Sequence, residues 1–265
     1  MKMRKILVLL VVVSLYKTNL NAQITQKYLN VDMGITGFVN ELPDNLKIRG
    51  DVPKYYYGNE PSTKMVNGYM HKQFLGLKAE IVIRDKFGWS VGVRYSQMKS
   101  SITKNNKDYG NDYFYLVTNE TATSSEYMKV REINQSSNYV GVPIEFRYFP
   151  YMPRKFRVFI KLAAEGTILL QTKTNVKFGD EAMAKNENDV TRNISNPAKL
   201  SSLLYGGFGI KYGQKSKPSV SIEFSGPAWF ASYKSNGMLN PVVGGGVQIN
   251  IQIPIGAKTE EVINQ

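Results

Sequence analysis

The sequence predicts an all-β fold, a closed antiparallel eight-stranded up-and-down β-barrel. Two observations predict it. Apolar and polar side chains alternate with a period of two in eight separate segments, which is the pattern of strands with one apolar face. The connections between these segments are alternately long and short, as in a barrel whose short turns all lie at one end.

The first four predicted strands are 28–39, 73–84, 87–96 and 138–149. Asp85 and Lys86 form a tight turn between the second and the third. Every second residue is apolar, so each strand has one apolar face. These faces are Leu29, Val31, Met33, Ile35 and Val39; Leu75, Leu77, Ala79, Ile81 and Ile83; Phe87, Trp89, Val91, Val93 and Tyr95; and Val140, Val142, Ile144, Phe146 and Tyr148.

The last four predicted strands are 156–171, 200–212, 219–225 and 242–253. They follow the same alternation over different lengths. Their apolar faces include Phe156, Val158, Ile160 and Leu162; Leu204, Phe208, Ile210 and Tyr212; Val220, Ile222 and Phe224; and Val243, Val247, Ile249, Ile251 and Ile253.

The connections fall into two classes. Long polar segments follow the first, third, fifth and seventh strands, and turns of a few residues follow the second, fourth and sixth. Both ends of the barrel are therefore expected on the short-turn side. The long segments are 40–70, 97–137, 172–199 and 226–241.

Residues 1–22 are predicted to be a cleaved signal peptide, because basic residues precede a short apolar run and a small-residue site ending in Ala22. Their removal takes four of the 34 basic residues and leaves 30 against 21 acidic ones, a net charge of +9. The chain has no Cys, so an exported protein would lack disulfides. We expect the barrel to occupy 23–254, with a periplasmic tail at 255–265.

The two faces of the strands predict a membrane barrel. The apolar faces are long enough to cross a hydrocarbon layer when tilted, and the opposite faces mix glycines with charges of both signs. An eight-stranded barrel is narrow enough for side chains to fill it. We therefore expect a transmembrane β-barrel of the cell outer membrane, with short periplasmic turns, long extracellular loops and paired charges inside. A plain solvated face remains the alternative.

The predicted interior charge network consists of Lys78, Glu80, Arg94, Glu145, Arg147, Lys161 and Glu165. The same polar faces also carry Asp32, Arg84, Arg157, Lys211 and Glu223. Buried charges need partners, because an isolated one costs several kcal/mol. Counting outward from the turns, we expect Glu145 opposite Lys161, and Glu80 opposite Arg94 or one pairing step away.

Aromatic and basic residues fit the same arrangement. Outward aromatics near the short turns predict an interfacial girdle of Phe87, Trp89, Phe146, Tyr148, Phe156 and Tyr212. Cations in the predicted loops would lie above anionic lipopolysaccharide: Lys47, Arg49, Lys54, Lys64, Lys99, Lys104, Lys107, Lys185 and Arg192. These cations are dispersed, so we do not expect a nucleic-acid partner.

No enzyme site is predicted. His71 is the only histidine and no nucleophile motif accompanies it, so we expect a polar residue without a catalytic role. With no Cys and no second His, we expect neither a metal nor a cofactor. The glycine runs at 206–209 and 244–246 lie within predicted strands and lack the residues of a phosphate loop.

Aromatic residues in the first two long connections are candidates for binding a protein or a glycan, because Tyr is amphipathic and loses little entropy on contact. The alternative is that these rings pack loop on loop or belong to strands that extend above the membrane. The candidates are Tyr55, Tyr56, Tyr57, Tyr109, Tyr113 and Tyr115.

The segment from Asn138 to Pro150, followed by 156–167, resembles the PorT-like outer-membrane β-barrel family of Bacteroidota. The shared feature is a Tyr-x-x-(Ile/Val)-Pro-aliphatic strand, a turn, and a strand that ends in Ala-x-x-Gly, here Ala163 and Gly166. The resemblance covers residues 23–254. It implies an outer-membrane location, a role in protein secretion for the family's namesake, and no catalytic residues.

Three functions are consistent with the sequence. The first is an outer-membrane scaffold or a surface binding module that acts through its loops. The second is an accessory of a secretion or transport system with partners in the envelope. The third is a soluble periplasmic barrel that holds an apolar ligand. A diffusion porin is not expected, because eight strands leave little open lumen.

Overall fold

The computed structural model describes residues 24–43, 46, 48–49, 66–104, 112–120, 125–151, 155–214, 217–232 and 237–255. The predicted signal peptide lies outside these residues, and so do all but the first residue of the predicted tail.

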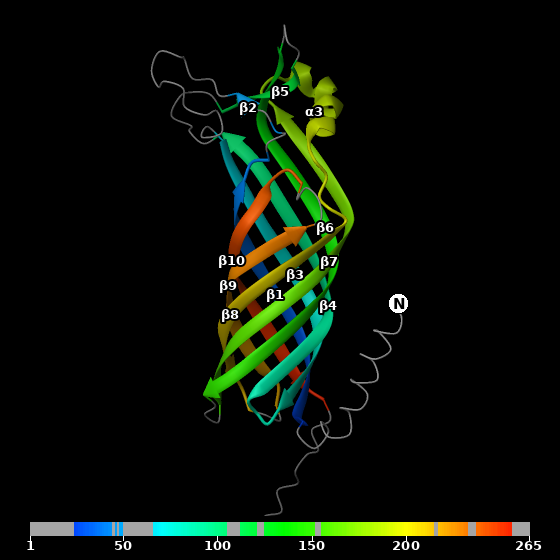
Figure 1. Ribbon diagram of the computed structural model, residues 1–265. Coiled ribbons are helices and arrows are strands. Elements are labelled where there is room, and N and C mark those ends of the chain that lie inside the picture. The colour runs from blue at the N-terminus through cyan, green and yellow to red at the C-terminus, as the bar shows by residue number, and fades with distance from the viewer. Residues whose placement is uncertain are drawn as a thin grey trace, which may run out of the picture.

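Eight long antiparallel strands form a closed ring (Figure 1). Consecutive strands of the ring are hydrogen-bonded neighbours, and the last pairs with the first. The prediction of an all-β, up-and-down antiparallel fold is confirmed. The ring strands are β1 (Ile24–Glu41), β3 (Val66–Ile83), β4 (Phe87–Lys104), β6 (Ser125–Tyr151), β7 (Phe156–Phe178), β8 (Leu200–Tyr212), β9 (Ser219–Ser232) and β10 (Asn240–Pro254).

The strands run past the ends that the sequence predicted. β6 begins at Ser125 and β7 continues to Phe178, so both cross segments that were predicted to be loops. Above the ring, β6 also pairs with β5 (Phe114–Glu120), which in turn pairs with β2 (Ile48–Arg49). The helical turns η2 (Glu181–Asn186) and α3 (Glu187–Asn193) lie at the same end. These extensions were missed because polar residues occupy much of both faces there, which hides the alternation.

The predicted cross-strand pairs were wrong. Glu145 lies opposite Ala163, and Lys161 lies opposite Arg147, because the pairing of β6 with β7 starts from Tyr151 opposite Val158 and not from the register assumed for the turn. Glu80 lies opposite Ser90, because the turn between β3 and β4 has three residues.

Arg84 was predicted to be in the interior, and this too was wrong. It lies in the turn that connects β3 to β4, with a positive φ of 50°, and its side chain is exposed.

The wall of the ring has apolar residues outside and charged residues inside. Val91, Ile144 and Ile160 are 51%, 51% and 57% exposed, whereas Arg94 and Lys161 are 1% and 2% exposed. This is the reverse of a water-soluble protein, whose charged groups stay in water. None of the helices that the structure describes is long and apolar enough to cross a membrane.

Glycines let neighbouring strands and side chains fit inside the narrow ring. Gly92 of β4 faces the interior opposite Lys78. A Cβ at Gly92 would lie 2.0 Å from the carbonyl oxygen of Leu77 and 2.6 Å from Cα of Lys78, so backbone atoms would have to move.

We predict that Gly92→Ala lowers the free energy of unfolding by about 1–3 kcal/mol, the usual cost of overpacking. The matched control is Gly166→Ala, because a Cβ there meets no atom within 4 Å. Urea titrations of both variants in detergent micelles check the prediction. Equal stability of the two would contradict the steric account.

Candidate functional site: the charged interior and the outer surfaces

The lower part of the interior, toward the short turns, contains a single connected network of ion pairs. It comprises five cations and five carboxylates from six strands, all at most 3% exposed. All seven residues predicted for an interior network belong to it. Its members are Asp32, Lys72, Lys78, Glu80, Arg94, Glu145, Arg147, Lys161, Glu165 and Glu223.

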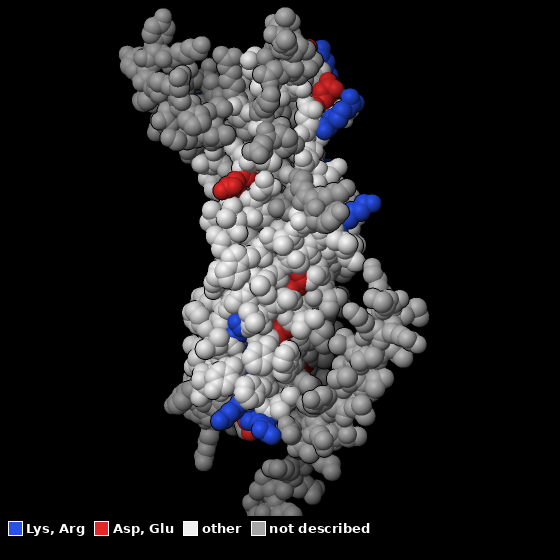
Figure 2. Space-filling model, in the orientation of Figure 1, with Lys and Arg blue, Asp and Glu red and all other residues white. Residues whose placement is uncertain are grey.

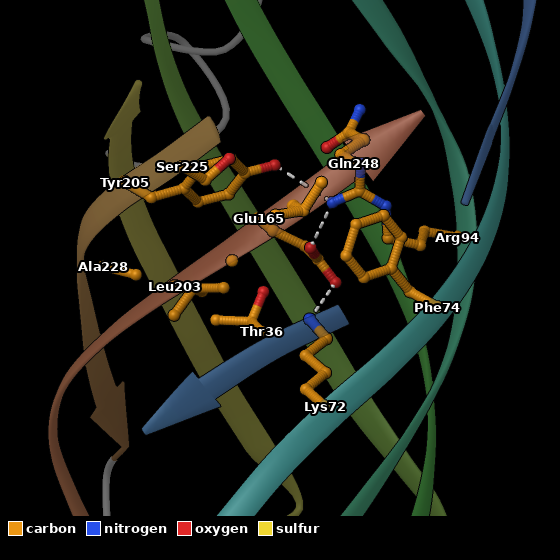
Figure 3. Close-up of a pocket in the computed structure, with 12 residues that line it drawn as sticks. Thr36, Lys72, Phe74, Arg94, Glu165, Leu203, Tyr205, Ser225, Ala228 and Gln248 are labelled. Atoms are coloured by element: carbon orange, nitrogen blue, oxygen red, sulfur yellow. Dashed lines mark hydrogen bonds and ion pairs between the residues drawn. The ribbon is translucent and has the colours of Figure 1, made fainter. Parts of the chain in front are cut away.

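Arg94 joins the upper half of this network. Its Nη1 lies 2.7 Å from Oε2 of Glu165, and its Nη2 donates to Asp32 and lies 3.2 Å from Oε1 of Glu145. Lys72 binds the other oxygen of Glu165 at 2.6 Å. The guanidinium also lies 4.2 Å from the centroid of the Phe74 ring (Figure 3). Arg94 therefore connects β1, β4, β6 and β7 across the interior.

Glu145 and Arg147 join the lower half. Glu145 forms ion pairs with Lys78 at 2.8 Å and with Arg147 at 3.0 Å. Arg147 also binds Glu80 at 3.1 Å and Glu223 at 2.8 Å, and Glu223 binds Lys161 at 2.5 Å. Each of these carboxylates thus has at least one cation within ion-pair distance.

Amide side chains also donate hydrogen bonds to two carboxylates of the network. Asn30 and Gln252 donate to Oε2 of Glu80 at 2.8 and 3.1 Å, and Asn250 donates to Glu223. These amides were not predicted to be members of the network. For Asn250 and Gln252, the regular alternation of amides with apolar residues in 247–253 was the available signal.

The upper part of the interior is apolar, which the sequence analysis did not predict. Phe38, Met70 and Ile102 are among the strand residues that point inward there. Loop residues Leu46, Val190, Ile194, Met238 and Leu239 pack on them. The interior above the ion pairs is therefore closed by a small hydrophobic core.

Gln135 of β6 ties two loops over this core. Its Oε1 accepts the backbone N–H of Met238 at 2.9 Å, and its Nε2 donates to the carbonyl of Ser195 at 3.1 Å. Gly237 approaches the same Oε1 so closely that a Cβ would lie 2.5 Å away, and its φ of +99° also favours glycine. The two loops are thus held at one polar residue.

One small cavity lies within the upper half of the ion-pair network. A cavity of about 10 Å³ lies beside Lys72, Arg94, Glu165 and Tyr205 (Figure 3). That is room for about one water molecule. A larger hollow of about 580 Å³ lies on the outer wall over β1, β3 and β10.

His71 lines the outer hollow together with Gly37, Tyr69 and Gly245. The described residues also contain no group of three or more side chains that could hold a metal ion.

The outer wall of the ring forms an uncharged band. On the face shown in Figure 2, the surface over the strands is largely white, with small charged patches between the larger ones near the two ends. β10 illustrates the band with outward residues Val247, Ile249, Ile251 and Ile253, each 40–43% exposed. The residues predicted as a girdle lie at its short-turn end, and five of them are 37–55% exposed: Phe87, Trp89, Tyr148, Phe156 and Tyr212.

Two of the six candidate binding aromatics lie in the part of the chain that the structure describes. The Tyr113 and Tyr115 rings make an edge contact at 5.6 Å, and both are half-buried. Lys129 Nζ lies 3.9 Å from the Tyr113 ring centroid. These two tyrosines therefore belong to the β5–β6 extension above the ring. Tyr55, Tyr56, Tyr57 and Tyr109 lie outside the described residues.

The β6–β7 extension carries exposed charge pairs. Lys177 Nζ lies 2.6 Å from Oε2 of Glu132. Hydrogen bonds from Lys177 and Asn134 hold the pKa of the Glu132 carboxyl below its ordinary value.

The sequence matches no protein-family model and no curated protein. Solved structures of similar shape include the outer membrane protein OprG from Pseudomonas aeruginosa, with 10% identity, a TM-score of 0.44, and coverage of 87% of this chain and 97% of that one. The transport unit of the autotransporter AIDA-I from Escherichia coli has 8% identity and a TM-score of 0.30, covering 91% and 97%. The outer membrane protease OmpT from Escherichia coli has 9% identity and a TM-score of 0.28, covering 87% and 96%.

We predict that Glu145→Gln lowers the free energy of unfolding by about 3–5 kcal/mol, because Lys78, Arg94 and Arg147 lose a shared buried carboxylate. The control is Glu132→Gln in the exposed pair, which should cost at most about 1 kcal/mol. Urea unfolding in micelles measures both. A small loss at Glu145 would show that the network is not what stabilises the interior.

Proposed function

We propose that this protein is a non-enzymatic outer-membrane β-barrel that acts as an envelope scaffold or surface binding module through its extracellular end. One observation carries the proposal: the outer wall is apolar, whereas the charges are sealed inside the ring. Exposing that apolar wall to water is unfavourable in free energy, whereas contact with hydrocarbon is not. A closed ring also leaves no strand edge inside the hydrocarbon, which a membrane requires.

The size of the apolar band fits a bilayer. From Val243 to Ile253 there are ten residue steps of about 3.3 Å each, and a tilt of about 40° gives a height of about 25 Å. That is the height of the apolar band on outer-membrane barrels. The exposed aromatic residues near the short turns would lie at the periplasmic interface.

The interior favours a scaffold over a pore or a carrier. Ion pairs fill its lower part and the hydrophobic core closes its upper part, with a cavity of only about 10 Å³ between their side chains. That space is too small for an apolar ligand, which argues against the soluble carrier.

Binding is therefore assigned to the extracellular end, where β6 and β7 extend beyond the other strands (Figure 1). Tyr127 is 40% exposed on this extension, and exposed basic residues such as Lys173, Lys177 and Arg131 accompany it. Lipid and lipopolysaccharide would surround the band, and the cations would lie next to anionic groups.

A role as a secretion or transport accessory is the second candidate, and it rests on the resemblance of 138–167 to the PorT-like family. It requires stable partners in the envelope. Co-purification of defined envelope proteins with the full-length chain from outer membranes would favour it over a scaffold that acts alone.

We expect the protein to fractionate with outer membranes and to migrate differently on semi-native gels before and after boiling. A closed barrel resists detergent until it is heated, so the unboiled form should be compact. Release into a soluble osmotic-shock fraction would refute the membrane assignment.

We predict that Val91→Lys lowers the free energy of unfolding in lipid vesicles by about 2–4 kcal/mol, because the charge enters the middle of the bilayer. In water, the same exposed position would tolerate Lys within about 0.5 kcal/mol. The matched control is Tyr127→Lys on the extension above the band, which should be neutral. Equal tolerance of both changes would contradict a membrane around the wall.

A further inference from the structure

Two buried cations are left over once the interior charges are paired. The ion-pair network balances five cations against five carboxylates. Arg157 and Lys211 are outside it, although they are only 2% and 0% exposed. Among the described residues, neither has a carboxylate within ion-pair distance. The interior therefore holds two buried basic side chains that form no ion pair with the described carboxylates.

The two cations are direct neighbours. Arg157 lies opposite Lys211 in the pairing of β7 with β8, next to the short-turn end of the ring. Both side chains are buried, so both point inward. Like charges at directly opposite positions repel each other, which makes the arrangement costly without a counter-charge.

Each cation presents an unsatisfied donor. Nη1 of Arg157 donates to Oε1 of Gln26 at 3.4 Å, but its Nη2 has no hydrogen-bond partner. Nζ of Lys211 also has none, and it lies 3.8 Å from the centroid of the Tyr28 ring. A ring face attracts a cation but neutralises no charge.

The nearby carboxylates are already engaged. Glu80 binds Arg147, Asn30 and Gln252. Glu223 binds Arg147 and Lys161. Drawing Glu223 toward Arg157 and Lys211 would leave Lys161 without a carboxylate. Drawing Glu80 away would break its contacts with Arg147, Asn30 and Gln252, so either rearrangement has a cost.

We propose that Arg157 and Lys211 form a binding site for an oxyanion at the short-turn end of the interior. A guanidinium and an ammonium side by side match the charge and the acceptor oxygens of a phosphate or a carboxylate. The site depends on the interior of the ring alone, and not on a membrane around the wall.

Two sources could supply this oxyanion. One is a free anion such as inorganic phosphate. The other is a carboxylate of residues 256–265, which include Glu260 and Glu261. That segment follows Ile255, whose backbone N–H donates to the carbonyl of Lys27 at the same end of the ring.

The test uses the full-length protein folded in uncharged detergent micelles. The thermal unfolding midpoint is measured at constant ionic strength while inorganic phosphate replaces a bulky sulfonate. We expect phosphate to raise the midpoint in a saturable manner, because a ligand that binds the folded state alone stabilises it. Line broadening of the phosphate phosphorus resonance by the protein reports binding directly.

Variants separate this site from general salt effects. Arg157→Gln with Lys211→Met should abolish both the shift and the broadening, and should still fold, because it removes unmatched charges. Arg157→Lys keeps the charge and should retain part of the response. Lys72→Met removes a buried cation that is paired with Glu165, so it should lower the midpoint in both buffers and keep the phosphate increment.

A chain that ends at Gly256 distinguishes the two sources. If phosphate stabilises the full chain, the site takes a free anion. If only the shortened chain responds, the carboxylate of the tail fills the site. The proposal is overturned if neither chain responds to phosphate, or if the double variant responds as the parent does.

Discussion

The closure of the sheet into a narrow ring, with charged side chains inside, is the constraint on which the rest of the structure depends. Once the strands close, charges on the inner face cannot reach water and must satisfy one another. This explains why Arg94 and Arg147 each bind three carboxylates, and why amides fill the positions between them. It also explains glycines such as Gly92, since long side chains need room that a Cβ would occupy.

Inward-facing side chains are satisfied in two different ways in the two halves of the ring. Near the short turns, buried charges form ion pairs. Near the long connections, the strands contribute to a hydrophobic core together with Val190 of α3 and with Ile194, Met238 and Leu239 of the connections. The second solution also holds these loops in place, through Gln135. Side chains of the described residues thus occupy both parts of the interior.

The sequence predicts the ring well because each strand repeats a two-residue pattern that needs no tertiary information. It predicts less where both faces turn polar, and so misses β5 and the upper parts of β6 and β7. The apolar upper core was missed for the same reason, because Met98, Ile102 and Ile133 fell within predicted loops. Lys72 was missed because the predicted strand began one residue later. The predicted cross-strand partners were wrong because turn lengths and bulges shift the register. Neither can be recognised from the alternation of apolar and polar residues.

The ion pairs have one more consequence, for strand alignment. Shifting the register of a strand by one residue would turn its apolar face inward, and the hydrophobic effect strongly disfavours that arrangement. Sliding it by two residues restores the alternation, so hydrophobicity alone cannot detect the mistake. Contacts such as Arg94 to Glu165, which join strands that are not neighbours in the ring, would be lost in the two-residue slip. The buried ion pairs therefore favour the native register over one that is shifted by two residues.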